Sequence, residues 1–288
     1  MASKAQAPYV QLRRLGRELR KLREDSGLTI EEAGKRIDRS DSTISRIETA
    51  VRAPQKIELK GLLEAYGADA ETTDFLLGLL RDVPEQGWWT AHEDAFPRSL
   101  EIYIGLETDA SALRVFALGA VHSLLRTEDY ARAILRAGLP TSPEKDIDKL
   151  VAAHMQRQQV LTREPQPVDL QVVLDEASLR RRVGNQQVMR DQLDRLIHSA
   201  EEVPNITLHV LPFSKGAHGS PTGGFTIIDF PDPTEPATVY LDTPGGNLYL
   251  QKPHDTRRFD QMYGRLCGAA LDTDDSVQFL RTVREEMR

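Results

Sequence analysis

The chain has 288 residues, with 37 Lys/Arg against 44 Asp/Glu and a formal net charge of −7. At roughly 100–200 residues per domain this length predicts two domains, and a single cysteine, Cys267, excludes a disulfide framework and any multi-cysteine metal site. No apolar stretch is long enough to span a bilayer, and the first residues lack the apolar core of a secretory signal. We therefore expect a soluble, cytoplasmic protein.

Charge is divided unevenly along the chain. Residues 1–56 carry 13 Lys/Arg and 8 Asp/Glu, whereas residues 57–288 carry 24 and 36. A basic head on an acidic body suggests an anionic partner for the N-terminus. Charge runs of this kind are also common on solvated faces, so the charge distribution alone does not establish an anionic partner, and the residue pattern is needed as well.

The N-terminal segment predicts consecutive short helices. Four leucines at helical spacing between Leu12 and Leu22 indicate a first helix, which Gly27 ends. Thr29 is an expected N-cap of the second helix, with Glu32 three residues on completing a capping box.

A tight turn follows the second helix. Asp38 is suited to the left-handed conformation, and Ser40 is an expected N-cap of a third helix. Gly34 lies where that helix would cross the second, and its missing side chain permits close approach. Further helices are predicted near residues 56–66 and 71–82. Two short helices joined by a tight turn predict a helix-turn-helix.

The stretch GLTIEEAGKRIDRSDSTISRIETAVRAP, residues 27–54, resembles the helix-turn-helix of Xre-type regulators and phage repressors. The resemblance implies a lambda-repressor-like all-α domain that binds double-stranded DNA, usually as a homodimer on an inverted repeat. The positions that it places at base edges are Ser40, Asp41, Ser42 and Arg46, with Thr43 beside them and Arg39 and Arg52 at the DNA backbone. It also implies that Arg23 and Glu48 form a buried structural pair.

The chain departs from this pattern at four positions. Ile30 stands where many relatives have Gln, Arg39 replaces a small apolar residue, and Ala50 replaces Gly. Asp41 puts a carboxylate on the reading face, where it repels phosphate but can accept from cytosine N4. Arg46 is suited to a bidentate contact with guanine, worth about 1–3 kcal/mol of discrimination.

The helical pattern breaks at residues 83–87, which divides the chain into a DNA-binding domain at 1–83 and a sensing or assembly domain at 84–288. Trp88 and Trp89 follow the break, either as packing anchors or as ligand-stacking residues. Residues 84–165 are predicted to be mainly helical, with one helix face running through residues 106–117. Thr127 is an expected N-cap within that region.

Residues 166–288 are predicted to be mixed α/β. Five short β-rich runs are bounded by Pro, Gly, Asn and Asp: VDLQVVLDE, ITLHVLPF, FTIIDF, TVYLDT and NLYLQ. Helices are expected near 142–162, 185–199, 256–270 and 275–286. The predicted fold class is α+β: an all-α helix-turn-helix domain, a helical subdomain and a mixed α/β domain.

Six ordered motifs then extend the resemblance to nearly the whole chain: GWW, YIGLE, LLRTEDYARAIL, LDEASLRRRVG, VLPFSKGAH and GGF…YLDT…LYL. Together they resemble the WhiJ-type, antitoxin-like Xre regulators of actinobacteria, whose C-terminal domain has a poorly defined function. The resemblance implies a developmental or stress-linked regulator with a small partner protein encoded nearby. His122-Ser123 replaces a common Pro-Gly and Arg126 a common Gln, so a contact made by this loop would differ here.

Enzymatic chemistry has one candidate centre, His218, in a Gly-rich loop after a strand. Asp229 and Asp242 stand at strand positions from which they could approach it, but no GxSxG or Walker pattern surrounds it. Asp175 is more readily a cap than part of a carboxylate pair. No histidine has metal-ligand spacing, so we expect no metal, no cofactor and no enzyme.

The sequence therefore predicts a DNA-binding transcriptional regulator whose C-terminal domain binds a small partner protein or ligand, with Trp88, Trp89, His122, Arg126 and His218 as candidate contacts. Two alternatives remain open. One is a protein-interaction module in which DNA binding is weak or lost. The other is an enzyme-like ligand domain centred on His218.

Overall fold

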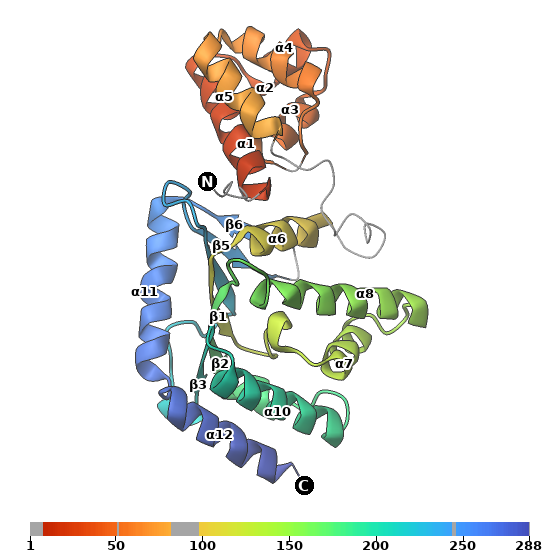
Figure 1. Ribbon diagram of the computed structural model, residues 1–288, viewed down its shortest axis with the longest axis vertical. Coiled ribbons are helices and arrows are strands. Elements are labelled where there is room, and N and C mark those ends of the chain that lie inside the picture. Colours follow the sequence, from red (N-terminus) through yellow and green to blue (C-terminus); the bar gives the residue numbers. More distant parts are fainter. Residues whose placement is uncertain (1–7, 51, 82–97, 244–245, 288) are drawn as a thin grey trace. The chain divides into compact units, whose positions relative to one another are not determined.

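The computed structural model describes residues 8–50, 52–81, 98–243 and 246–287. The chain divides into an N-terminal unit, residues 1–88, and a C-terminal unit, residues 89–288. The predicted boundary at residues 83–87 falls outside the described residues. Figure 1 labels helices and strands of both units.

The N-terminal unit is all-α, with α1 (Pro8–Asp25), α2 (Ile30–Arg36), α3 (Asp41–Glu48), α4 (Lys56–Tyr66) and α5 (Ala70–Arg81). The apolar faces of these helices pack together to form its core, in which Leu15, Leu19, Ile44 and Ile47 are fully buried. Both N-caps predicted here are confirmed: Thr29 caps α2 through a capping box, and Ser40 caps α3.

The C-terminal unit is built on one six-stranded sheet. Its strands are β1 (Ala112–Ala117), β2 (Asp169–Asp175), β3 (Ile206–Leu211), β4 (Phe225–Asp229), β5 (Thr238–Leu241) and β6 (Leu248–Leu250). The strand order is β3-β2-β1-β4-β5-β6. β1, β2 and β3 are parallel, and β4, β5 and β6 continue the sheet antiparallel.

The register aligns the strands around β1. Val115 pairs with Val172 of β2 on one side and with Thr226 of β4 on the other. The helices are α6 (Arg98–Asp109), α7 (Glu128–Gly138), α8 (Glu144–Arg157), α9 (Glu176–Arg180), α10 (Gln186–Glu202), α11 (Pro253–Ala269) and α12 (Thr273–Glu286). Short 3-10 helices cover Ser123–Leu125 (η2), Gln158–Leu161 (η3) and Phe213–Lys215 (η4).

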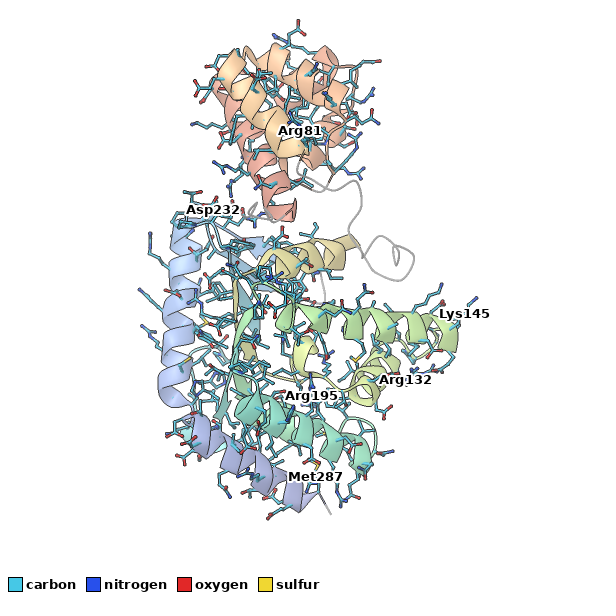
Figure 2. All side chains as sticks on the ribbon, in the orientation of Figure 1. Arg81, Arg132, Lys145, Arg195, Asp232 and Met287 are labelled. Atoms are coloured by element: carbon cyan, nitrogen blue, oxygen red, sulfur yellow. The ribbon has the colours of Figure 1, made fainter. Side chains whose placement is uncertain are left out.

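Helices cover both faces of this sheet (Figure 1). On one face, α11 contributes Tyr263 and Leu266 to a core with Phe116, Val173 and Phe225. The opposite face carries α6, α8 and α10, and Tyr103 of α6 stacks on Tyr240 of β5 with ring centroids 4.2 Å apart. Side chains fill the space between the sheet and these helices (Figure 2).

The α+β class and the mixed sheet agree with the sequence prediction, but one element differs. The helix face predicted through residues 106–117 is wrong: α6 ends at Asp109 and residues 112–117 form β1. Because β1 pairs with β2 and β4, it occupies an interior position of the sheet. The predicted helical subdomain is therefore not separate from the α/β domain.

Candidate functional site

The exposed face of α3 carries the residues predicted to read DNA. Asp41 and Ser42 are exposed, whereas Ile44 and Ile47 of the same helix are fully buried in the core. Ser40, Asp41 and Ser42 stand at the N-terminus of α3, where backbone N–H groups and hydroxyls are suited to phosphate and base edges. The helix thus presents a polar face on a rigid support.

Local hydrogen bonds fix the start of α3. The Ser40 hydroxyl accepts from the Thr43 N–H at 3.2 Å and lies 2.9 Å from the Ser42 hydroxyl. One carboxylate oxygen of Asp41 accepts from the Ser42 N–H at 2.7 Å. Ser40 and Asp41 therefore act in capping, and each keeps an exposed side chain toward solvent.

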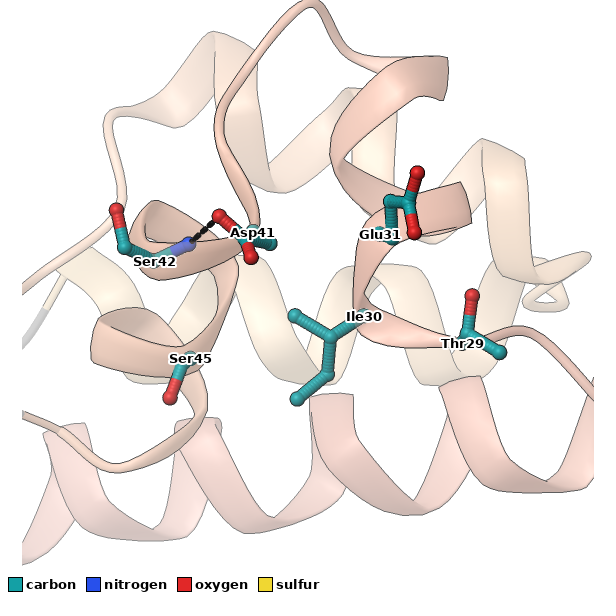
Figure 3. Close-up of a pocket in the computed structure, with 6 residues that line it drawn as sticks. All are labelled: Thr29, Ile30, Glu31, Asp41, Ser42 and Ser45. Carbon is teal, nitrogen blue, oxygen red and sulfur yellow. Dashed lines mark hydrogen bonds between the residues drawn. The ribbon is translucent and has the colours of Figure 1, made fainter.

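A pocket opens beside these residues, between the N-terminal ends of α2 and α3 (Figure 3). Its lining residues are Thr29, Ile30, Glu31, Asp41, Ser42 and Ser45. Glu31 and Asp41 give it two carboxylates, and Ile30 gives it an apolar wall. This edge of the reading face is therefore less favourable for phosphate than the rest of α3.

Arg46 lies one turn further along α3 and is half-buried. In the described part of the chain its guanidinium forms no hydrogen bond or ion pair, so all of its donors are available to an incoming acceptor. A guanidinium that is not committed within the protein is suited to the O6 and N7 atoms of guanine.

Arg39 and Arg52, the predicted backbone contacts, converge on a buried carboxylate. Glu58 of α4 accepts from Arg39 Nε at 2.8 Å and from Arg52 Nη2 at 2.9 Å, and its Oε2 also accepts from the Gln55 N–H at 2.8 Å. Burial opposes ionisation of Glu58, but these hydrogen bonds outweigh burial and hold its pKa below the ordinary value. The same contact raises the pKa of Arg39.

Glu58 is not among the site residues predicted from the sequence. The signal that was present is local: Glu58 is the third helical residue after Gln55, and the two form a capping box at the start of α4. Its two arginine partners come from the turn before α3 and the segment after it, which the sequence does not connect to α4.

Arg23 and Glu48 join α1 to the end of α3. Arg23 Nε lies 2.6 Å from Glu48 Oε1, and Nη2 lies 2.9 Å from Oε2. Arg23 Nη1 donates to the Leu28 carbonyl at 2.9 Å. Both side chains are almost fully buried, so this bidentate pair sets the position of α3 on α1.

In the C-terminal unit, the structure places His218 beside the carboxyl end of β2. Its Nε2 lies 3.9 Å from Asp175 Oδ2, and Nδ1 accepts from the Ser220 N–H. Asp175 also caps α9, as predicted. Asp229 does not approach His218: it pairs with Arg114 at 3.0 Å.

The hydroxyls near His218 are committed to the backbone. Ser178 donates to the Asp175 carbonyl and Ser220 donates to the Gly223 carbonyl, both at 2.7 Å. Neither hydroxyl is hydrogen-bonded to the imidazole in the described residues, so these contacts fix a loop and do not activate a nucleophile.

The remaining candidates are His122 and Arg126, which the structure brings close together around η2. His122 Nε2 lies 3.4 Å from the Tyr103 hydroxyl, and Arg126 Nε donates to the Val121 carbonyl at 2.7 Å. Trp88 and Trp89 lie outside the described residues. Burial raises the pKa of the single free thiol, Cys267.

A helix-turn-helix domain model matches residues 14–76, and this domain supports a DNA-binding regulator. A second model, a domain of unknown function (DUF5753), matches residues 100–282. Because that match covers more than half of the chain, the protein belongs to the DUF5753 family. No curated protein and no solved structure matches the chain.

No helix among the described residues is long and apolar enough to cross a membrane. They also contain no group of three or more His, Cys, Asp or Glu side chains arranged to hold a metal ion.

Proposed function

We propose that the chain is a sequence-specific transcriptional regulator of the antitoxin-like Xre type, and that α3 reads DNA in the major groove. The uncommitted guanidinium of Arg46 on the polar face of α3 is the observation that carries the proposal. Ser40, Asp41, Ser42 and Thr43 complete the reading face. Arg39 and Arg52, held by Glu58, contact the phosphates on either side.

One such module makes too few base contacts for strong specificity, so the regulator acts as a homodimer on an inverted repeat with half-sites about one helical turn apart. Residues 57–288 carry an excess of acidic groups, which repel the DNA backbone. The N-terminal unit alone therefore faces the duplex. The C-terminal unit binds a small partner protein or a ligand, which alters the affinity of the dimer for paired half-sites.

The first experiment selects bound fragments from pooled genomic DNA with the purified full-length protein at about 0.1 M salt, where moderate affinity is still visible. An enriched inverted repeat supports the proposal and supplies the operator. No enrichment, with the protein folded, contradicts sequence-specific binding by the chain alone.

Arg46→Ala then tests the reading residue on the selected operator. We expect a loss of about 1–3 kcal/mol in specific binding, with discrimination relaxed at one base position of each half-site. Arg20→Ala is the matched control, because Arg20 is an exposed arginine of α1 that pairs only with Glu24 in the described residues. Equal effects of the two variants would show that α3 does not read the sequence.

The two carboxylates beside the reading face, Glu31 and Asp41, favour a second candidate: a protein-interaction module in which DNA binding is secondary. The Arg46→Ala variant separates the two in cells. If partner-dependent regulation persists when DNA binding is lost, the interaction function is the correct one.

A further inference from the structure

Four basic side chains meet in the C-terminal unit between η2 and α8. His122 and Arg126 flank η2, and His154 and Arg157 lie one turn apart on α8. Hydrogen bonds join the two segments: Arg157 Nη2 donates to the Ser123 hydroxyl at 3.1 Å, and the Gln158 side chain donates to the Arg126 carbonyl at 2.7 Å. The two histidines are neutral at neutral pH, so the charge that calls for compensation is that of the two arginines.

One member of the cluster is fully compensated. Arg157 Nε and Nη2 donate to the two carboxylate oxygens of Glu107, each at 2.8 Å, and both side chains are almost completely buried. Nη2 also donates to the Ser123 hydroxyl at 3.1 Å. The Glu107 carboxylate therefore neutralises Arg157, and both of its oxygens are occupied, so it is not available to pair with Arg126.

Arg126 has no such partner. Its Nε donates to the neutral Val121 carbonyl at 2.7 Å, and no carboxylate of the described chain lies within ion-pair distance. Burial lowers the pKa of Arg126 to about 10, and Arg157 adds to the lowering, whereas Tyr130 and Asp242 oppose it. Arg126 is thus a half-buried positive charge with no carboxylate partner among the described residues.

Each of the two histidines has one nitrogen without a partner. Among the described residues, the buried Nδ1 atoms of His122 and His154 form no hydrogen bond. The Tyr103 hydroxyl lies 3.4 Å from His122 Nε2, and either atom can donate. In the tautomer in which the phenol donates, the hydrogen of the neutral imidazole is on Nδ1. His154 is only 9% exposed, so its unpartnered nitrogen cannot turn to bulk water.

The scaffold around these donors is fixed. Gln158 donates to the Ser123 and Arg126 carbonyls, the latter at 2.7 Å, and Gln192 donates to the Leu125 carbonyl at 2.8 Å. The η2 segment is therefore held in place before any ligand arrives, which lowers the entropic cost of binding.

We propose that this cluster binds a small oxyanion, the carboxylate or phosphate group of a small molecule. Arg126 supplies the charge, and the Nδ1 atoms of His122 and His154 supply directional hydrogen bonds. A cation is disfavoured by the two guanidinium groups, and the burial of His154 favours a small ligand over a protein side chain. As an effector site of a regulator the cluster rests on the proposed function, but oxyanion binding itself does not require DNA.

The test is a titration of the full-length protein with inorganic phosphate or acetate, at ionic strength held constant with sodium chloride. Imidazole NMR signals, assigned with His122→Gln and His154→Gln, report the site directly. We expect saturable shifts of the His122 and His154 signals and a rise in Tm. The anion that saturates at the lower concentration identifies the class as phosphate or carboxylate.

Arg126→Gln keeps the size and polarity of the side chain while removing its charge, and we expect its Kd for the anion to rise about tenfold or more. Arg258→Gln, an exposed arginine of α11, is the matched control and should bind as the parent does. The proposal is overturned if the parent signals do not shift saturably, or if Arg126→Gln binds as tightly as Arg258→Gln. Since no DNA is present, a failed operator selection leaves this result interpretable.

Discussion

Gly34 decides how closely the turn of the helix-turn-helix can pack on α2. A Cβ at this position would lie 2.6 Å from the Arg39 carbonyl oxygen and 3.3 Å from the Ser40 carbonyl carbon. Both neighbours are backbone atoms of the turn that leads into α3, so they cannot move aside without displacing the reading face.

Gly34→Ala should therefore destabilise the N-terminal unit by about 1–3 kcal/mol, since overpacking outweighs the better helix propensity of alanine. Gly78→Ala is the matched control, because a Cβ on this glycine of α5 meets nothing within 4 Å. We expect that variant to be stabilised by up to about 1 kcal/mol. Urea unfolding of both variants measures the difference, and stabilisation of both would show that the turn is not tightly packed.

At single residues, the sequence predicts structure well where the stabilising contact is local. Thr29 with Glu32, Ser40, and Asp38 with its φ of 56° all adopt the predicted capping or turn geometry. Each of these geometries depends on atoms no more than three or four residues apart in the sequence. The contacts of Glu58 span up to 19 residues, and no periodicity in the sequence records them.

Among the elements, α3 presents the sharpest electrostatic conflict. Asp41 places a carboxylate on its exposed face beside Glu31, at a surface proposed to approach phosphates. The same carboxylate accepts from the Ser42 N–H and complements the positive end of the helix dipole. Its effects on stability and on DNA binding therefore have opposite signs.

Asp41→Asn keeps the hydrogen bond to Ser42 and removes the charge. We expect DNA affinity to rise about fivefold at low salt, from roughly 1 kcal/mol of relieved repulsion, and stability to fall by about 0.3–1 kcal/mol. Glu71→Gln, an exposed change on α5, is the control. If Asp41→Asn instead weakens binding at one base position, the carboxylate accepts from cytosine and does not act mainly by repulsion.

β1 shows why one element was assigned wrongly from the sequence. Apolar residues at 106, 110, 113 and 117 fit a helical period across the end of α6 and the whole of β1. The residues of β1 also include Val115 and Phe116, which are typical of strands. Short apolar runs do not separate helix from strand by periodicity alone, and the pairing of β1 with both β2 and β4 decides the outcome.

For the whole molecule, the sequence predicted the kinds of element in each unit but not the strand order. Five of the six strands coincide with predicted β-rich runs. β1 pairs in parallel with β2, and the connection between them folds back so that the loop with His122 and Arg126 contacts α8 through Arg157 and Gln158. Such proximity arises from non-local pairing, which a single sequence does not reveal.

The same burial that defines the basic cluster makes the C-terminal unit sensitive to acid. Burial, together with Arg157, Arg126 and the neighbouring histidine, lowers the pKa of His122 to about 3, and burial with the two arginines does the same for His154. The ordinary value is about 6.5. Between these pH values the unfolded chain binds protons that the folded unit does not. The contribution of these histidines to the free energy of unfolding is therefore fully present above about pH 6.5 and decreases as the pH falls.

The free energy of unfolding of the C-terminal unit should therefore decrease by up to about 1.4 kcal/mol per pH unit for each histidine below pH 6.5. Urea unfolding of the full chain at pH 5, 6 and 7, with pulsed hydrogen exchange of β1 and β2 peptides, measures this unit alone. His154→Gln should reduce the slope by one proton relative to the parent chain. Carboxylates titrate identically in the parent and the variant, so an equal slope would mean that His154 already binds its proton in the folded protein.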